Sequence, residues 1–174
     1  MAGYGDKPFG LRDVKLTNLA GTTQVDLPVG RTLSVKERAV TGELSGDDAL
    51  AAVVAFSEGG EWGLEAGGLS LEAYALMTGR TVASAGVTPN RTWTLSLDAA
   101  EAFPYFKIYG KVLGDSTDDV HCKMSKCKLT GPIEGDFKGG DFWVTKCAGI
   151  AVDDGSVGWA QFVQNETATT LPTS

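Results

Sequence analysis

The sequence predicts a mainly β protein, either a β-sandwich or a partly open barrel, flanked by one short α-helix. Three observations predict this class. Apolar and polar residues alternate with period two in several segments, most clearly at residues 92–98. The 23 glycines are scattered rather than periodic, which is typical of many tight turns. Helical spacing is clear only at residues 71–78. We therefore expect one domain over residues 1–174, with about eight to ten strands.

The first half of the chain predicts four strands. Residues 11–19 and 23–29 come first, and two strand-like arms follow at residues 31–40 and 49–56. The arms flank TGELSGDD, so a pairing between them makes a long hairpin with an acidic tip. A helix beginning at Asp47 or Asp48 is the competing prediction, because ALAAVVAF follows a good N-cap. The β-branched pair Val53-Val54 and the Glu58-Gly59-Gly60 breaker favour the strand.

One short helix is predicted over residues 71–78. Ser70 is suited to the N-cap, Glu72 to the positive end of the dipole, and Gly79 to a left-handed residue after the last turn. Eight residues rise only about 12 Å, too little for a stable isolated helix. One face must therefore dock on a sheet, and the helical spacing places this face at Leu71, Tyr74, Ala75 and Thr78.

The second half predicts further strands at residues 92–98, 104–113, 120–129, 141–152 and 159–164. In the first of them, Trp93, Leu95 and Leu97 are expected to face the core. The second and third are expected to form a hairpin. An N-terminal arm, about residues 1–10, and a C-terminal tail, about residues 165–174, are expected to be flexible unless a contact holds them.

Charge and composition restrict the function. The formal net charge is −7. Because nucleic-acid affinity comes mostly from Lys and Arg, a chain this acidic is a poor candidate for binding DNA or RNA tightly. No stretch approaches the ~20 apolar residues of a membrane helix, so no membrane insertion is expected. The start, MAGYGDKPFG, lacks the basic and apolar parts of a signal peptide, which predicts assembly in a reducing cytoplasm.

No coherent catalytic set is apparent, and we expect neither an enzyme nor a cofactor. His121, Cys122, Cys127 and Cys147 are conceivable zinc ligands. On a regular strand, however, Cys122 faces away from both His121 and Cys127, so free thiols are the favoured interpretation. The pairs Asp118-Asp119 and Asp153-Asp154 are expected to brace turns. A lysine cluster in the predicted hairpin has two interpretations. It is a polyanion-binding face, or it is an exposed face whose charges meet carboxylates of a neighbouring subunit or keep sheet edges from aggregating; we favour charge pairing. Its members are Lys107, Lys111, Lys123, Lys126 and Lys128.

The order of several segments resembles a known family. GELSGDD, then EAGGLSLEAYALMTG, then FPYFKIYGKVLGD and DVHCKMSKCKLTGPIEGDFKGGDF are similar to the major tail (tail tube) proteins of long-tailed, siphovirus-type bacteriophages. The similarity runs over about residues 10–152. It implies hexameric rings whose inner sheets join into one continuous β-barrel, stacked into a tube that conducts DNA. It also implies a virion protein, assembled in the host cytoplasm with tail tip or initiator, tape measure and tail terminator proteins.

The resemblance implies roles for two groups of residues. A loop reaching an adjacent subunit or ring is expected at Gly42, Glu43, Leu44, Ser45, Gly46, Asp47 and Asp48. Candidates for the channel lining are Glu37, Glu58, Thr92, Thr94, Ser96 and Asp98. Six chains of charge −7 carry 6 × −7 = −42 formal charges per ring, and a lumen lined with carboxylates would let duplex DNA pass without sticking.

Two alternatives stay open. The tube protein of a related contractile tail or secretion-type injection system would share the ring. A ligand-binding β-sandwich, such as a carbohydrate-binding module, would use Trp62, Trp93, Trp143 or Trp159 as a stacking platform.

Overall fold

The computed structural model describes residues 7–27, 29–46, 49–98, 102–114 and 117–172. The chain is mainly β with one short helix, as the sequence predicts. The elements in order are β1 (Phe9–Asn18), β2 (Gln24–Asp26), β3 (Gly30–Gly46), β4 (Ala49–Gly67), α1 (Leu71–Thr78), β5 (Val82–Ala85), β6 (Thr92–Leu95), β7 (Phe106–Leu113), β8 (Asp119–Leu129), β9 (Val144–Ala151) and β10 (Gln161–Asn165).

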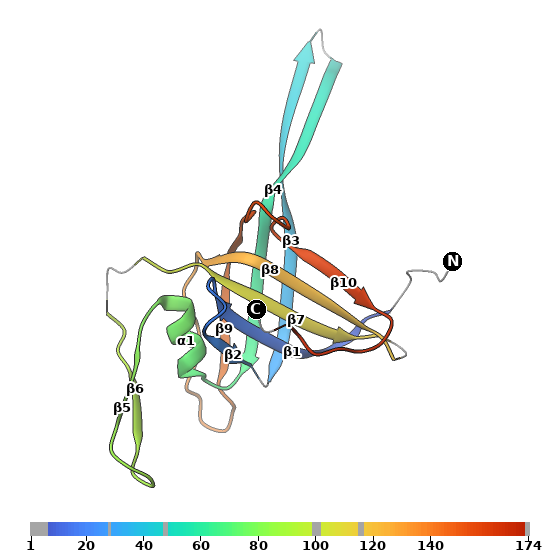
Figure 1. Cartoon of the computed structure of the whole chain (residues 1–174). Coiled ribbons are helices and arrows are strands. Elements are labelled where there is room, and N and C mark those ends of the chain that lie inside the picture. The colour runs from blue at the N-terminus through green and yellow to red at the C-terminus, as the bar shows by residue number, and fades with distance from the viewer. Residues whose placement is uncertain (1–6, 28, 47–48, 99–101, 115–116, 173–174) are drawn as a thin grey trace.

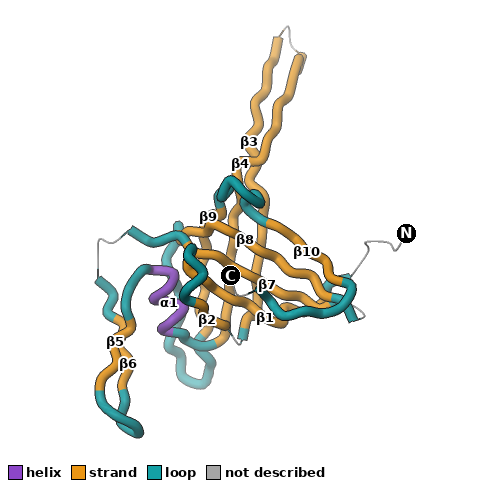
Figure 2. Tube along the Cα trace, in the orientation of Figure 1, coloured by secondary structure: helices purple, strands orange, loops and turns teal. Residues whose placement is uncertain are grey.

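Eight strands form one antiparallel sheet with the order β2-β1-β7-β8-β9-β4-β3 (Figures 1 and 2). β10 joins this sheet through β8, so β8 has two partners along the same edge. Its first residues, 119–123, pair with β10, and its last residues, 127–129, pair with β9. The sheet bends so strongly that β3 approaches β1 from the far end of the order: a Cβ at Gly30 would lie 2.9 Å from Val14. The sheet is not closed into a barrel.

The core lies inside this bend. Trp62 from β4 meets Phe106 from β7 edge-to-face, with ring centroids 5.6 Å apart. This arrangement is favourable for aromatic rings beyond the area that they bury. The fully buried residues around the pair come from β1, β7 and β8 and include Val14, Leu16, Ile108, Met124 and Cys127. The bend brings β4 opposite β7, and we call these two parts of the sheet the β4 layer and the β7 layer. The contact between Trp62 and Phe106 fixes how one layer packs on the other.

The helix has the bounds and caps predicted from the sequence. The Ser70 hydroxyl accepts a hydrogen bond from the Ala73 amide at 3.2 Å, and Gly79 adopts a left-handed φ of 79°. The docking face needs correction. Of the predicted face, Thr78 is buried, whereas Leu71, Tyr74 and Ala75 are only partly buried. The other buried residues of the helix are Ala73 and Met77. The helix covers an open end of the bend and contacts strands on more than one side, so apolar spacing along one stripe did not identify its buried face.

The β3–β4 hairpin is longer than predicted. Residues 49–56 belong to β4, so the competing helix prediction is wrong. The expected breaker at Glu58-Gly59-Gly60 is also wrong, because β4 continues to Gly67. The pairing instead steps from Arg38–Gly59 to Ala39–Ser57, which leaves Glu58 as the extra residue of a β-bulge. Asp47 and Asp48 lie outside the described residues.

The prediction of a half-buried strand at residues 92–98 is wrong. β6 pairs only with β5, in a two-stranded sheet beside α1 that is separate from the main sheet (Figure 2). Trp93 is 59% exposed and Leu97 63% exposed. The alternating pattern correctly indicated extended structure, but a two-stranded sheet has no layer behind it, and its apolar side chains stay in solvent.

Candidate functional site

The outer part of the β3–β4 hairpin projects from the body as a two-stranded ribbon (Figure 1). We define the ribbon as residues 39–46 of β3 with residues 49–57 of β4, beyond the bulge at Glu58. A two-stranded hairpin standing alone in water is marginal at best. The ribbon contains most of the loop expected to reach a neighbouring subunit, namely Gly42, Glu43, Leu44, Ser45 and Gly46. The remaining two residues of that prediction, Asp47 and Asp48, fall outside the described part.

One face of the ribbon is apolar from the Val40–Phe56 pair to the Leu44–Ala52 pair. Cross-strand partners share a face, and the register pairs Val40 with Phe56, Gly42 with Val54, and Leu44 with Ala52. Leu44 is 64%, Val54 60% and Phe56 58% exposed. A contiguous apolar surface of this kind on a projecting element marks an interaction site.

Below the ribbon, the same side of the β3–β4 layer carries paired charges instead of apolar side chains. The alternation along β3 places Lys36 and Arg38 on the same side of the strand as the apolar face, and each has a carboxylate partner. Lys36 pairs with Glu61 at 3.3 Å, and Arg38 pairs with Glu58 at 3.4 Å. The outer surface of the β3–β4 layer is thus polar and charge-matched in the body and becomes apolar only on the ribbon.

The channel-lining candidates do not form one surface. Glu37 and Glu58 lie at the base of the ribbon, where Glu58 is paired with Arg38. Thr92 and Thr94 lie on β6, and Ser96 and Asp98 follow it, all outside the eight-stranded sheet. Both groups were expected to line one channel, but Thr92 to Asp98 belong to or follow the separate β5–β6 hairpin and not the main sheet that carries Glu37 and Glu58.

The hairpin predicted from residues 104–113 and 120–129 is confirmed, because β7 pairs with β8 in antiparallel fashion. Its thiols are placed differently from the prediction. The pairing steps from Ile108–Met124 to Phe106–Cys127, so β8 carries an extra residue at this point. The bulge reverses the alternation, and Cys122 and Cys127 both face the core. Burial raises the pKa of Cys122 to about 11 and that of Cys127 further still. Within the described residues, no group of three or more His, Cys, Asp or Glu side chains is arranged to hold a metal ion.

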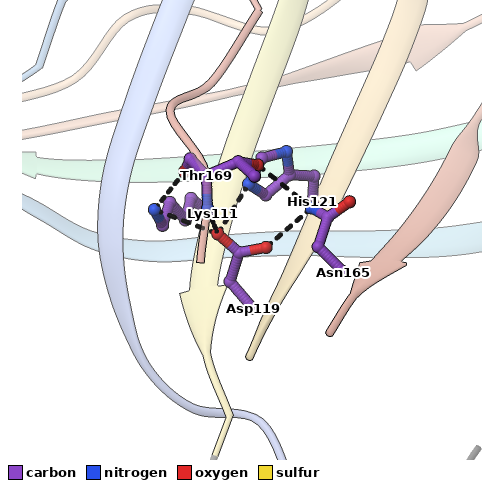
Figure 3. Close-up of polar contacts among 5 residues, drawn as sticks. All are labelled: Lys111, Asp119, His121, Asn165 and Thr169. Atoms are coloured by element: carbon purple, nitrogen blue, oxygen red, sulfur yellow. Dashed lines mark hydrogen bonds and ion pairs between the residues drawn. The ribbon is translucent and has the colours of Figure 1, made fainter. Parts of the chain in front are cut away.

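The other face of β7 and β8 carries a buried carboxylate, Asp119, that joins four segments (Figure 3). Its Oδ1 accepts a hydrogen bond from Asn165 Nδ2 at 2.7 Å. Its Oδ2 accepts one from the Thr169 amide at 2.7 Å, and lies 3.0 Å from Lys111 Nζ and 3.1 Å from His121 Nε2. The Lys111 ammonium also donates to the Thr169 carbonyl. We call this group the Asp119 clasp.

The clasp is electrostatically favourable although the carboxylate is fully buried. Burial by itself raises the pKa of Asp119, but the bonds from Asn165, the Thr169 amide, Lys111 and His121 outweigh it and lower the pKa to about 2. A His–Asp pair can orient a catalytic base. Here, however, the same carboxylate oxygen also holds the Lys111 ammonium and a backbone amide. The geometry is that of an anchor.

The clasp holds the end of the chain against the sheet. Residues 166–172, which we call the C-terminal strap, follow β10 and return across the face of β7 and β8. Leu171 is 2% exposed and Tyr109 is fully buried, yet neither belongs to the core cluster, because they lie on the opposite side of the sheet. The expectation of a free tail from residue 165 is therefore corrected for residues 165–172. The sequence contained a signal for this contact: Leu171 is the one large apolar residue in NETATTLPTS.

The tryptophans proposed as a stacking platform have different environments. Trp62 is buried in the core, and Trp159 is partly buried against it. Trp143 packs against Phe137, with ring centroids 4.3 Å apart. Only Trp93 is mainly exposed among the four. A separate apolar cavity of about 220 Å³ lies between α1 and the sheet, lined by Leu27, Leu64, Met77 and Cys147 among others.

No protein-family model matches the chain, and no curated protein matches it. Within the described part of the chain, no helix combines the length and hydropathy needed to cross a membrane.

Proposed function

We propose that this chain is a structural subunit that self-associates into stacked hexameric rings and forms the tail tube of a long-tailed bacteriophage. The observation that carries the proposal is the ribbon. Its apolar face, with Leu44, Val54 and Phe56 more than half exposed, has no cover in the described residues of the same chain. Burying apolar surface contributes about 25 cal/mol per Å². A neighbouring subunit that covered the ribbon would therefore stabilise both the contact and the ribbon itself.

Two further features support assembly. β3 is a terminal strand of the main sheet over 17 residues, and β4 is its only strand partner in the described chain. A long open edge favours pairing with another chain. The net charge supports the role of a conduit, because an assembly with −42 charges per ring repels phosphates overall. Glu37, which is exposed at the base of the ribbon, is retained as the candidate for the lumen.

The proposal includes no catalytic activity and no cofactor. The partners are copies of the same chain, tail tip, tape measure and terminator proteins, and duplex DNA that passes without sequence-specific contacts. Assembly would take place in the host cytoplasm and end in the virion. The tube of a contractile tail or of a secretion-type injection system would use the same ring, and the presence of a sheath around isolated particles would distinguish it.

The experiment is imaging of the purified full-length chain. Negative-stain microscopy and size-exclusion chromatography with light scattering over a concentration series should reveal rings or tubes. The triple variant Leu44→Ser, Val54→Ser, Phe56→Ser should fold but assemble poorly, because only exposed side chains are changed. The matched control alters the other face of the ribbon: Ala39→Ser, Val53→Ser, Ala55→Ser. A strict monomer at every concentration, even with tail-assembly partners added, would contradict the proposal, and so would normal tubes from the triple variant.

A carbohydrate-binding module is the candidate from another class. The exposed ring of Trp93 is the observation that favours it, since sugar sites stack on exposed aromatics. Saccharide binding by a strictly monomeric protein, lost in Trp93→Ala, would select this function over the tube.

A further inference from the structure

The face of β7 and β8 that carries the clasp also carries a row of lysines. We define the lysine–tyrosine face as Tyr105, Lys107, Lys123, Lys126 and Lys128. Lys126 Nζ lies 5.1 Å and Lys128 Nζ 4.9 Å from the centre of the Tyr105 ring. Lys123 Nζ lies 5.8 Å from the ring of Tyr109. Lys107 alternates along β7 between these two tyrosines and so shares their side of the strand.

Among the described residues these lysines have no carboxylate within ion-pair distance, which distinguishes them from the cations of the β3–β4 layer. Lys36 and Arg38 on β3 and Lys146 on β9 are each within 3.4 Å of a glutamate oxygen of β4. The ion pairs of the described residues include none for Lys107, Lys123, Lys126 or Lys128, and the last three lie against tyrosine rings. The ammonium groups of Lys126 and Lys128 both lie within 5.1 Å of the Tyr105 ring centre, and two cations on one ring repel each other unless an anionic partner approaches.

A second surface has the opposite character. The loop at residues 134–142, between β8 and β9, carries Glu134, Asp136 and Asp141, against one cation, Lys138. Phe137 is 88% and Phe142 90% exposed, the highest values among large apolar side chains in the described chain. We call it the acidic–aromatic loop.

The acidic–aromatic loop is tied to the sheet rather than free. The Glu134 amide donates to the Lys146 carbonyl at 2.8 Å, and the Lys146 amide donates back at 2.9 Å. At the other end, Trp143 bonds to the Thr145 hydroxyl through Nε1 at 2.8 Å. A loop fixed at both ends loses less conformational entropy when it binds.

We propose that the lysine–tyrosine face is the docking surface for the acidic–aromatic loop of a second copy of this chain. The carboxylates of the loop would meet the lysines, and its two phenylalanine rings would offer π faces to the same ammonium groups and apolar contact to Tyr105. The proposal rests on the proposed function in one respect: it takes another copy of the chain as the partner.

Charge complementarity favours a second copy over a nucleic acid. The four lysines contribute +4, so the rest of the chain carries −7 − 4 = −11. A phosphate backbone approaching the face would be repelled by this surrounding charge, whereas a second copy supplies a local acidic loop. The two surfaces are different parts of one chain, so the contact is heterologous. Contacts of this kind build closed rings or open filaments rather than a symmetric dimer.

Charge exchange in the full-length protein tests the proposal. The face variant is Lys126→Glu with Lys128→Glu, and the loop variant is Asp136→Lys with Asp141→Lys. Each opposes like charges across the contact, so sedimentation velocity should show self-association weakened about tenfold or more. An equimolar mixture of the two variants, or one chain carrying all four changes, should restore it. The control, Lys7→Glu with Arg91→Glu, has the same charge change on exposed residues away from the face, the loop and the ribbon, and should associate like the parent.

The outcomes separate this proposal from the proposed function. Normal association of both variants would overturn the docking contact, even if tubes form. Weakened association without rescue in the mixture would also overturn it, because charge pairing across one contact requires rescue. Rescue in a protein that never forms rings or tubes would support the contact and contradict the tail tube. Binding of a 30-base-pair DNA duplex that the face variant loses, with self-association intact, would overturn the contact and assign the face to nucleic acid.

Discussion

Replacing Asp119 by asparagine keeps the shape of the side chain and removes the charge at the centre of the clasp. The parent carboxylate is stabilised by folding, because its pKa is about 2 instead of the ordinary 3.8. At 1.36 kcal/mol per pKa unit, this difference corresponds to about 2.5 kcal/mol. The change also leaves the Lys111 ammonium, whose side chain is 16% exposed, without its counterion. Breaking a buried ion pair costs about 3–5 kcal/mol, and Lys111 can turn partly to water, so we expect a loss of about 2–3 kcal/mol.

Urea unfolding followed by tryptophan fluorescence measures this loss at pH 7. For a domain of this size, the melting temperature should fall by about 4–12 °C. Asp98→Asn is the matched control. Its carboxylate is exposed, and the change should alter the unfolding free energy by less than about 0.5 kcal/mol.

The difference in unfolding free energy between the parent and Asp119→Asn should depend on pH. A carboxyl group whose pKa is lower in the folded state contributes stability above its unfolded pKa and loses it as the pH falls through its folded pKa. The parent should therefore lose its advantage over Asp119→Asn between about pH 4 and pH 2. Truncation after Glu166 removes Thr169 and Leu171, and in that background the cost of Asp119→Asn should be smaller. Equal costs in full-length and truncated chains would refute the idea that Asp119 acts through the strap.

Three further predictions concern the core, the helix and the thiols. Gly149→Ala should destabilise the fold by about 1–3 kcal/mol in urea unfolding, because a Cβ there would lie 2.0 Å from the Lys128 carbonyl oxygen and 2.6 Å from the Trp62 ring. The control, Gly139→Ala, should not destabilise the fold, because a Cβ there would have no neighbour within 4 Å. Ser70→Ala should cost about 1 kcal/mol by removing the N-cap of α1, and Ser70→Asp should retain stability in the same assay; equal losses in both variants would argue against capping. Burial raises the pKa of Cys122 to about 11 and that of Cys147 to about 12. A thiolate-specific disulfide reagent at pH 8 should therefore label the folded protein far more slowly than it labels glutathione. Fast labelling of all three cysteines would contradict their burial.

Local signals in the sequence predicted individual elements well and their partners less well. Ser70 and Gly79 specified both ends of α1, because capping depends on residues within one turn. The alternation at residues 92–98 correctly indicated an extended segment. It did not show that β6 pairs with β5 alone, since pairing is decided by distant residues. The same limit explains the helix face, whose buried side depends on how the surrounding sheet bends.

The two β-bulges account for other errors. A single extra residue at Glu58 let β4 pass through the predicted breaker, and another in β8 brought Cys122 and Cys127 to one face. Period-two reasoning fails after such an insertion. The Asp119 clasp was missed because its members are up to 58 residues apart in sequence, as for Lys111 and Thr169. The adjacent aspartates at positions 118 and 119 were read as a turn, and only the fold brings the end of the chain to one of them.

The divided edge of β8 has a consequence for the motions of the folded chain. Residues 119–123 depend on β10 for their second set of interstrand bonds, whereas residues 127–129 depend on β9. The C-terminal segment can consequently peel away while β9 keeps its place, an opening that exposes only part of the sheet. Deuterium uptake should then divide within a single strand: amides that bond to β10 would exchange together with those of the strap, and amides that bond to β9 would exchange only when the whole domain unfolds.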